Sequence, residues 1–248
     1  MNPTGSQTDG NREKNGEMGT GEVAMDWSPV LISMKTAGLS ILITFFLGIF
    51  AAWRVVCIKS RCWKFIWDGI LTLPLVLPPT VAGFFLLYIF GVKRPVGQFF
   101  LDFFSVKIAF SWGATVIAAV TMSFPLMYRS ARGAFEQVNP DLVAAARTLG
   151  MGEWTIFRKV LLANAVPGVV SGGVLAFARG LREFGATAMI AGNIAGKTRT
   201  LPMAVYSEVA AGNMDSAFAY VAVIAAIAFI SILVMNAAAW KAGGGIHG

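Results

Sequence analysis

Five apolar runs, each close to the length that crosses a lipid bilayer, constrain the fold of this chain more than any other feature. A helix needs about 20 predominantly apolar residues to span the hydrocarbon core. The runs cover residues 30–53, 70–92, 108–128, 160–181 and 216–240. Because lipid cannot satisfy backbone polar groups, a spanning segment must be an α-helix or part of a closed barrel. Runs of this length predict an all-α integral membrane protein with five transmembrane helices.

The composition supports the same class and excludes others. Of the 248 residues, 56% belong to the apolar set AVILMFWYC and only 13% are charged, whereas about 25% are charged in soluble domains. The net charge of +7 would by itself suggest a nucleic-acid partner. The Lys and Arg residues, however, gather at the ends of the apolar runs, as they do in membrane proteins. A disordered protein, a coiled coil and a nucleic-acid module are excluded, and lipid is the expected surrounding.

Few side chains are suited to bind a metal or a cofactor. The only histidine, His247, lies in a Gly-rich tail, and Cys57 and Cys62 share one short basic segment with no histidine near them. Two thiols without a further ligand make a poor metal site. No metal site and no cofactor are therefore predicted.

The apolar runs are flanked by two short tails. Residues 1–24 are polar, lack apolar periodicity and predict a disordered tail rather than a signal peptide. Met25 directly precedes the apolar region, which leaves an alternative start at that residue open. Residues 25–241 then form one transmembrane domain, and residues 242–248 a flexible tail.

The distribution of basic residues predicts the orientation of the chain. The segments after the first, third and fifth runs hold ten of the 20 Lys and Arg residues, against seven on the other side. Cytoplasmic loops carry the excess of Lys and Arg. This places the N-terminus outside and the C-terminus in the cytoplasm, which fits an odd number of spans.

Two prolines interrupt the second run. Pro74 and Pro78 are four residues apart and lie on one face of a helix. Each removes a backbone donor and presses against the preceding turn. A broken helix of this kind lines a wet path in many transporters, but a simple packing kink explains the same pattern, and the sequence leaves both interpretations open.

The fourth run ends in a group of charges. Before them, Gly168, Gly172, Ala176 and Gly180 recur every fourth residue and favour close helix packing. Arg179 and Glu183 follow with the spacing of an ion pair along a helix. Such a pair either ends the span or forms the polar rim of a translocation path. Residues 184–193 are apolar but too short to cross, which suits a re-entrant piece.

The segment 139–154 predicts a compact helix-turn-helix. Pro140 suits a first helical turn, three alanines continue the helix, and Gly150 suits its C-terminal cap. A knob of this kind can dock into a groove on a partner. A simple connecting loop is the alternative, although so much helix-forming sequence makes it less attractive.

This segment resembles the cytoplasmic coupling loop of bacterial ABC importer permeases. Their signature reads Glu-Ala-Ala, three residues, Gly, nine residues, then Ile-x-Leu-Pro. Ala145, Ala146 and Gly150 match it, and Val160 and Leu162 occupy the Ile and Leu positions. Ala144 replaces the Glu and Ala163 replaces the Pro, so this chain does not place a carboxylate at the first position.

Three longer stretches look like the molybdate permease subfamily of these importers. They are residues 73–81, 122–127 and 175–187, and the match continues through Asn193 and residues 197–202. The resemblance covers roughly residues 25–241. Sulfate permeases share part of the Glu-Phe-Gly-Ala pattern and are the nearest alternative.

The resemblance implies a type I ABC importer permease fold in a bacterial cytoplasmic (inner) membrane, with a coupling helix between spans three and four. It also implies a homodimer, two cytoplasmic ATPase subunits and an extracytoplasmic oxyanion-binding protein. The residues expected to couple to the ATPase are Ala144, Ala145, Ala146, Arg147, Leu149, Gly150 and Glu153, and those expected along the path are Pro74, Pro78, Arg179, Glu183, Thr187 and Asn193.

The function implied is transport of molybdate by alternating access, with tungstate or sulfate as alternative substrates. The chain has no Gly-x-x-x-x-Gly-Lys-Ser/Thr loop for ATP, so it is expected to be the transport subunit and not an enzyme. A passive channel would fit the spans but leave the knob unexplained. An intramembrane hydrolase would need paired carboxylates or a nucleophile with its base, and the five runs contain no Asp or Glu.

Overall fold

The structure, a computed structural model, describes residues 26–243, and within that range every regular element is helical. The predicted tail 1–24 and residues 244–248 lie outside the described residues. Residues 242 and 243, predicted to be in the flexible tail, are instead the last residues of helix α11 (Met214–Gly243).

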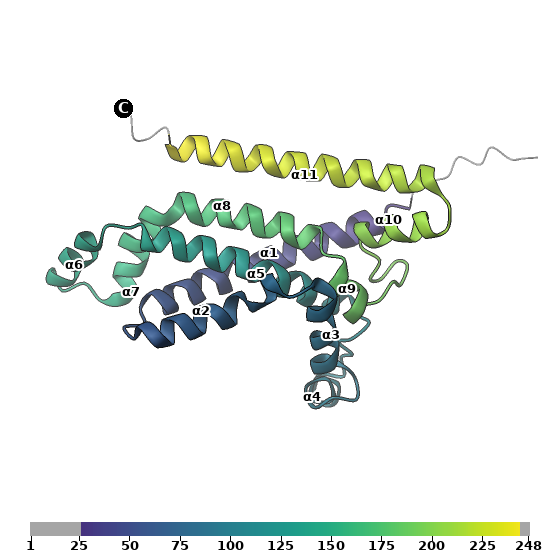
Figure 1. The fold of residues 1–248 in the computed structure, drawn as a ribbon, viewed down its shortest axis with the longest axis horizontal. Coiled ribbons are helices and arrows are strands. Elements are labelled where there is room, and N and C mark those ends of the chain that lie inside the picture. The colour runs from purple at the N-terminus through teal and green to yellow at the C-terminus, as the bar shows by residue number, and fades with distance from the viewer. Residues whose placement is uncertain (1–25, 244–248) are drawn as a thin grey trace, which may run out of the picture.

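Four long helical segments form the body of the molecule (Figure 1). They are α1 (Ser28–Val56), α5 (Trp112–Glu136), α8 (Leu162–Leu181) and α11. Helix α5 is central and packs on both α1 and α8, while α11 packs on α8. Helix α8 is preceded by α7 (Glu153–Ile156) and by a π-helical turn, η1 (Phe157–Leu161).

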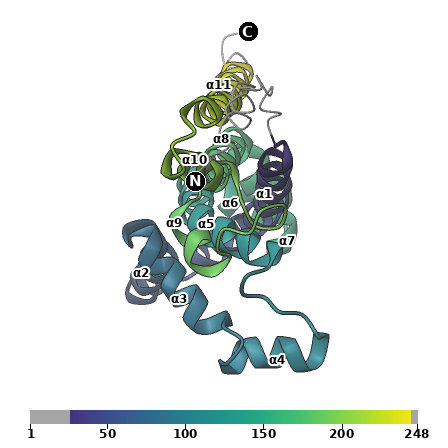
Figure 2. The ribbon, with the colours of Figure 1, turned by 90° about the vertical axis from the view of Figure 1, so that its right-hand side faces the viewer.

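Shorter helices lie at the two ends of this body. Helix α6 (Pro140–Thr148) lies with α7 at one end, and α9 (Gly185–Ile190) and α10 (Leu201–Ala210) lie toward the other. Helices α3 (Pro79–Phe90) and α4 (Pro95–Phe104) project sideways, as Figure 2 shows from the end of the bundle. We call residues 79–104 the arm.

The second predicted run is interrupted more strongly than a kinked span would be. Helix α2 (Arg61–Val76) ends before Pro78, and α3 leaves it at an angle of 109°. Pro74 remains inside α2, whereas Pro78 and Pro79 begin α3. The single run at 70–92 is thus two helices, because two adjacent prolines leave no backbone donors to continue the first helix.

Three described helical segments are long and apolar enough to cross a membrane: Ser28–Val56, Glu153–Leu181 and Met214–Val234. The bent pair α2 and α3 raises the number to four if it forms one span. Helix α5, which matches the third predicted run, has 25 residues but is not among them. Arg129, Arg132 and Glu136 lie in its last turns. The total of five spans stays a prediction.

The glycine stripe on α8 is a packing surface, as predicted. A Cβ atom added at Gly168 would lie 2.6 Å from the Ala134 Cβ, and one added at Gly172 would lie 2.5 Å from the Ser130 Cβ. Real Cβ atoms do not approach this closely, so only glycine allows α8 to contact α5 here. Residue numbers increase along α8 from Gly168 to Gly172 while those of their partners on α5 decrease from Ala134 to Ser130, so the two helices are antiparallel.

Hydroxyl groups join α1 to α5 inside the bundle. The Oγ1 atoms of Thr36 and Thr115 are 3.0 Å apart, and Thr44 Oγ1 lies 3.1 Å from Ser123 Oγ. Both pairs are separated by 79 residues, so α1 and α5 run in the same direction. Interhelical hydrogen bonds in membranes contribute about 0.6 kcal/mol each on average. These contacts were not predicted, because neither helix alone reveals its neighbour.

Candidate functional site

Residues 139–156 form a helical hairpin, the α6–α7 hairpin, at one end of the bundle (Figure 1). The Asn139 side chain accepts a hydrogen bond of 2.9 Å from the backbone N–H of Asp141, and Pro140 occupies the first turn. Asparagine is among the best residues for this capping position. The predicted start of α6 is therefore confirmed.

The hairpin turns at Gly150, which has a positive φ of 74°. Its N–H donates to the Arg147 carbonyl at 2.9 Å, and the Met151 N–H donates to the Ala146 carbonyl at 3.1 Å. A left-handed glycine just past the end of a helix satisfies the last carbonyls in this way. The predicted glycine cap is confirmed.

An ion pair holds the two helices of the hairpin together. Arg147 donates from Nε to Glu153 Oε1 at 2.8 Å and from a terminal nitrogen to Oε2 at 3.2 Å. The hydrogen bonds that Arg147 donates to Glu153 raise the pKa of Arg147 and lower that of Glu153, so the pair stays ionised at ordinary pH. A two-point contact between planar groups fixes geometry as well as distance.

The residues predicted to meet an ATPase lie on different sides of α6. Ala144, Ala145 and Leu149 are exposed, and the Leu149 side chain is 77% accessible. Ala146 is buried, because its side of α6 packs on α7 and η1. Its small side chain lets the hairpin close, and any part that Ala146 has in coupling is through the packing of the hairpin and stays a prediction.

A cluster of aromatic rings attaches the hairpin to the first long helix. The ring centroid of Trp53, near the end of α1, lies 5.6 Å from that of Trp154 and 4.8 Å from that of Phe157. Trp154 and Phe157 stack at 5.3 Å. Trp53 was missed in the sequence, since nothing in its local pattern reveals a partner a hundred residues away.

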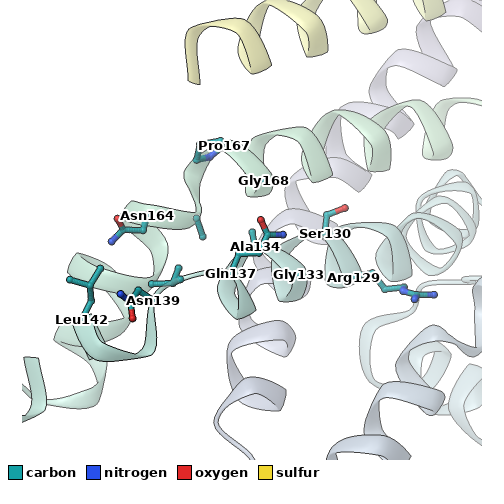
Figure 3. Close-up of a pocket in the computed structure, with 12 residues that line it drawn as sticks. Arg129, Ser130, Gly133, Ala134, Gln137, Asn139, Leu142, Asn164, Pro167 and Gly168 are labelled. Atoms are coloured by element: carbon teal, nitrogen blue, oxygen red, sulfur yellow. The ribbon is translucent and has the colours of Figure 1, made fainter. Parts of the chain in front are cut away.

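A cavity of about 640 Å³ separates the start of the hairpin from the long helices. Figure 3 shows Asn139, Leu142 and Asn164 at one end of it and Ser130 and Arg129 at the other. Helix α6 packs mainly on α7 and η1 rather than on α5 or α8. The hairpin is therefore joined to the body through its aromatic anchor, through Val143, which packs against the core cluster, and through α7, which continues by way of η1 into α8.

The second group of predicted residues lies where α8 ends. Arg179 donates to Glu183 at 2.5 Å, as their spacing predicted, and the other Glu183 oxygen accepts the Ala186 backbone N–H at 2.8 Å. Glu183 is only 3% exposed. A buried carboxylate with a guanidinium and a backbone donor has its charge compensated.

This ion pair faces the start of α3 across a small pocket. The pocket measures about 440 Å³ and is lined by Pro79, Thr80, Arg179, Arg182, Glu183, Phe184 and Gly185. The backbone approaches closely here, because a Cβ added at Gly185 would lie 2.8 Å from the Pro79 Cβ. Arg182 and Thr80 join the site only through this fold-back of α3, which no local pattern reveals.

Thr187 and Asn193 lie apart from that pocket. Thr187 is buried in α9, a helix of six residues that is too short to cross a membrane, as predicted. Asn193 is exposed, donates to Ser207 Oγ at 2.7 Å and accepts from Arg199 at 2.9 Å. In this conformation Thr187 is closed to solvent because α9 is enclosed by α3 and α5, and its place along the path stays a prediction.

Apolar helices of spanning length, joined by a stiff charged hairpin and a buried ion pair, define a polytopic α-helical membrane protein. The chain belongs to the family described as the inner membrane component of binding-protein-dependent transport systems, whose profile matches residues 44–240.

Relatives and solved structures agree with this assignment. The chain is 44% identical over 213 residues to the molybdenum transport system permease protein ModB of Escherichia coli (strain K12), covering 84% of this chain and 91% of that protein. It is 40% identical over 207 residues to the putative molybdenum transport system permease protein YvgM of Bacillus subtilis (strain 168), covering 83% and 90%.

Two solved structures share the fold at low sequence identity. A bacterial ABC transporter involved in the import of the acidic polysaccharide alginate superposes with a TM-score of 0.72 at 15% identity, over 86% of this chain and 78% of that one. The MetNI methionine ABC transporter in an inward-facing conformation gives 0.68 at 16% identity, over 88% and 97%. These similarities establish the fold as that of ABC importer permeases.

Proposed function

We propose that this chain is the membrane-spanning permease subunit of an ATP-driven importer that moves molybdate across the cytoplasmic membrane by alternating access. One observation carries the substrate: relatives from distant bacteria that match over most of their lengths are named as molybdenum transport permeases. Tungstate and sulfate, which are also tetrahedral dianions, are the alternative substrates.

Five spans with the N-terminus outside are part of this proposal. Because α1 and α5 run in the same direction, the segment between them must return to the starting end of the bundle. If both helices cross the membrane, α2 and the arm must cross it as well. Helix α8 then returns, and α11 ends on the side that carries the hairpin (Figure 1). The excess of Lys and Arg places that side in the cytoplasm.

The α6–α7 hairpin is proposed to couple the chain to a cytoplasmic ATPase dimer. Exposed Ala144, Ala145 and Leu149 would enter a groove of the partner. The Arg147–Glu153 clamp and the Gly150 turn keep the hairpin rigid. A rigid element passes a displacement to α8 instead of absorbing it, and this is how ATP-driven closure would tilt the spans.

The anion path is proposed to pass the pocket between α3 and the end of α8. A dianion needs a wet route lined by donors, and the break at Pro78 opens the helical wall beside it. Glu183 compensates Arg179, so Arg182 leaves this region with a net positive charge. Pro74, Thr187 and Asn193 would border the path only in another conformation.

A second copy of the chain and an extracytoplasmic oxyanion-binding protein complete the proposed complex. The arm carries exposed aromatic side chains that include Phe84, Phe85, Phe99 and Phe103. A projecting apolar arm suits a symmetric contact between two copies, since each would cover the other.

Reconstituted transport tests the proposal. The chain, the ATPase and the binding protein encoded beside it would be placed in proteoliposomes, and uptake of labelled molybdate would be measured with competing tungstate or sulfate. We expect ATP-dependent uptake that an inactive ATPase abolishes. Uptake without ATP would favour a passive channel, and competition by sulfate at equal concentration would favour a sulfate permease.

A further inference from the structure

A largely apolar groove lies beside the hairpin, between the end of α1 and the start of α2. It encloses about 800 Å³. Its walls include Phe50, Ala51 and Trp53 of α1 and Trp67 and Leu71 of α2. The proposed transport cycle uses the Arg147–Glu153 pair that borders this groove but assigns no role to the groove itself.

An exposed apolar stripe along α1 runs into the groove. Leu42, Phe46 and Phe50 follow one another at four-residue spacing, and their side chains are 58%, 67% and 53% exposed. Residues with this spacing share one face of a helix. The next position on that face is Arg54, where the stripe meets the mouth of the groove.

The mouth of the groove is positively charged. Arg54, Lys59 and Arg147 line it together with Glu153. Arg147 is compensated by Glu153, which leaves Arg54 and Lys59 as the net charge. The Arg54 guanidinium lies 5.9 Å from the centre of the Phe50 ring. Basic groups above an aromatic and aliphatic slot match a phosphate joined to a hydrocarbon chain.

We propose that this groove binds one anionic glycerophospholipid of the cytoplasmic leaflet, with its phosphate between Arg54 and Lys59 and one acyl chain along Phe46 and Phe50. The choice of leaflet rests on the orientation proposed above. Charge complementarity favours an anionic lipid, because the headgroup of a zwitterionic lipid would bring a third positive charge to a mouth that already holds Arg54 and Lys59. The lipid would join α1 to the hairpin, since Arg147 and Glu153 form one wall.

Lipid binding to the purified full-length chain tests this without any transport assay. The chain would be titrated in mild detergent with phosphatidylglycerol or phosphatidylcholine, and native mass spectrometry would count the lipid bound. We expect one phosphatidylglycerol per chain at concentrations where phosphatidylcholine does not bind. Each basic residue near the phosphate contributes about fivefold, so Arg54→Gln with Lys59→Gln should weaken binding about twenty-five-fold.

Two variants separate a built site from general surface attraction. Arg61→Gln removes an exposed charge at the first residue of α2, two positions after Lys59, and Arg61 does not line the groove; screening should limit its effect to about twofold. Ala51→Trp fills the groove without changing charge and should abolish the bound phosphatidylglycerol while the chain elutes normally on size exclusion.

Three results would overturn the proposal. They are equal binding of the two lipids, an effect of Arg61→Gln as large as that of the double variant, and failure of Ala51→Trp to reduce the phosphatidylglycerol bound. Loss of molybdate uptake would leave the lipid count unchanged, so failure of the transport proposal would be recognised separately.

Discussion

The backbone conformation of Gly150 sets the angle between the two helices of the α6–α7 hairpin. A side chain in the left-handed region costs about 1–2 kcal/mol, and a Cβ atom added at Gly150 would meet nothing within 4 Å. Gly150→Val should therefore strain the turn without a clash. We expect the assembled complex to persist but to lose at least about tenfold in anion-stimulated ATP hydrolysis, because small misplacements of a positioned element cost large factors in rate.

Gly152 provides the matched control in the same turn. It also has open space around it, but its φ of −67° and ψ of 150° suit any residue. Gly152→Val should retain coupling close to wild type. Normal stimulation of hydrolysis in Gly150→Val would mean that the hairpin angle does not carry the ATPase stroke.

A second prediction concerns the contribution of the Arg179–Glu183 pair to the stability of the folded chain. Removing one partner of a buried pair leaves an uncompensated charge and typically costs about 3–5 kcal/mol. Glu183→Gln should lower the thermal unfolding midpoint of the purified chain strongly. The double variant with Arg179→Gln should recover much of the loss, because no lone charge remains. An equal loss in the single and double variants would show that packing, not charge compensation, matters here.

The sequence predicted the contacts of single residues wherever the two partners lie close together in the chain. The spacing of Arg179 and Glu183 predicted their pair, and Pro140 and Gly150 predicted the ends of α6. The burial of Thr187 and the place of Arg182 depend on α3 folding back over α9. That contact spans about a hundred residues and leaves no local pattern to read.

Helix packing depends on the glycine stripe of α8. Gly172→Ala would place a methyl group 2.5 Å from the Ser130 Cβ, and overpacking of this kind costs about 1–3 kcal/mol. We expect a lower midpoint of thermal unfolding in detergent. Gly133→Ala is the matched control on α5, because an added Cβ there meets nothing within 4 Å, and it should be neutral or slightly stabilising. Equal midpoints for the two variants would remove the stripe as the reason for close packing.

The arrangement of helices α2 and α3 could be predicted from the sequence only in part. Two prolines predicted an interruption in the second run, but not its angle of 109°. Helix α2 has no fully buried residue, and two ion pairs join it to α5: Lys64 with Glu136 at 2.8 Å, and Asp68 with Arg132. These pairs join residues more than 60 positions apart, and apolar periodicity cannot reveal them.

The directions of the helices support the predicted number of spans better than apolarity alone does. Helix α5 carries charges in its last turns and is not among the helices apolar enough to cross. Nevertheless it lies at the centre of the bundle, parallel to α1 and antiparallel to α8. We expect a central helix that packs between two helices of spanning length to lie at membrane depth as well. The sequence predicted the runs, and the structure supplies the directions that relate them.

Reporter fusions test this arrangement for the whole molecule. Fusions after Ser60 and Gly243 should report a cytoplasmic location, and fusions after Gly97 and Gly212 an extracytoplasmic one. Gly97 follows the bent pair and Gly212 lies in the exposed turn before α11, so together they bracket α5 and α8. If α2 and the arm formed a re-entrant loop, the Gly97 fusion would report the cytoplasm. Helix α5 would then have to carry the hairpin outside, away from any ATPase. A cytoplasmic signal at Gly97 would therefore contradict both the five spans and the coupling role of the hairpin, whereas the expected pattern requires the polypeptide to cross once between α1 and α5.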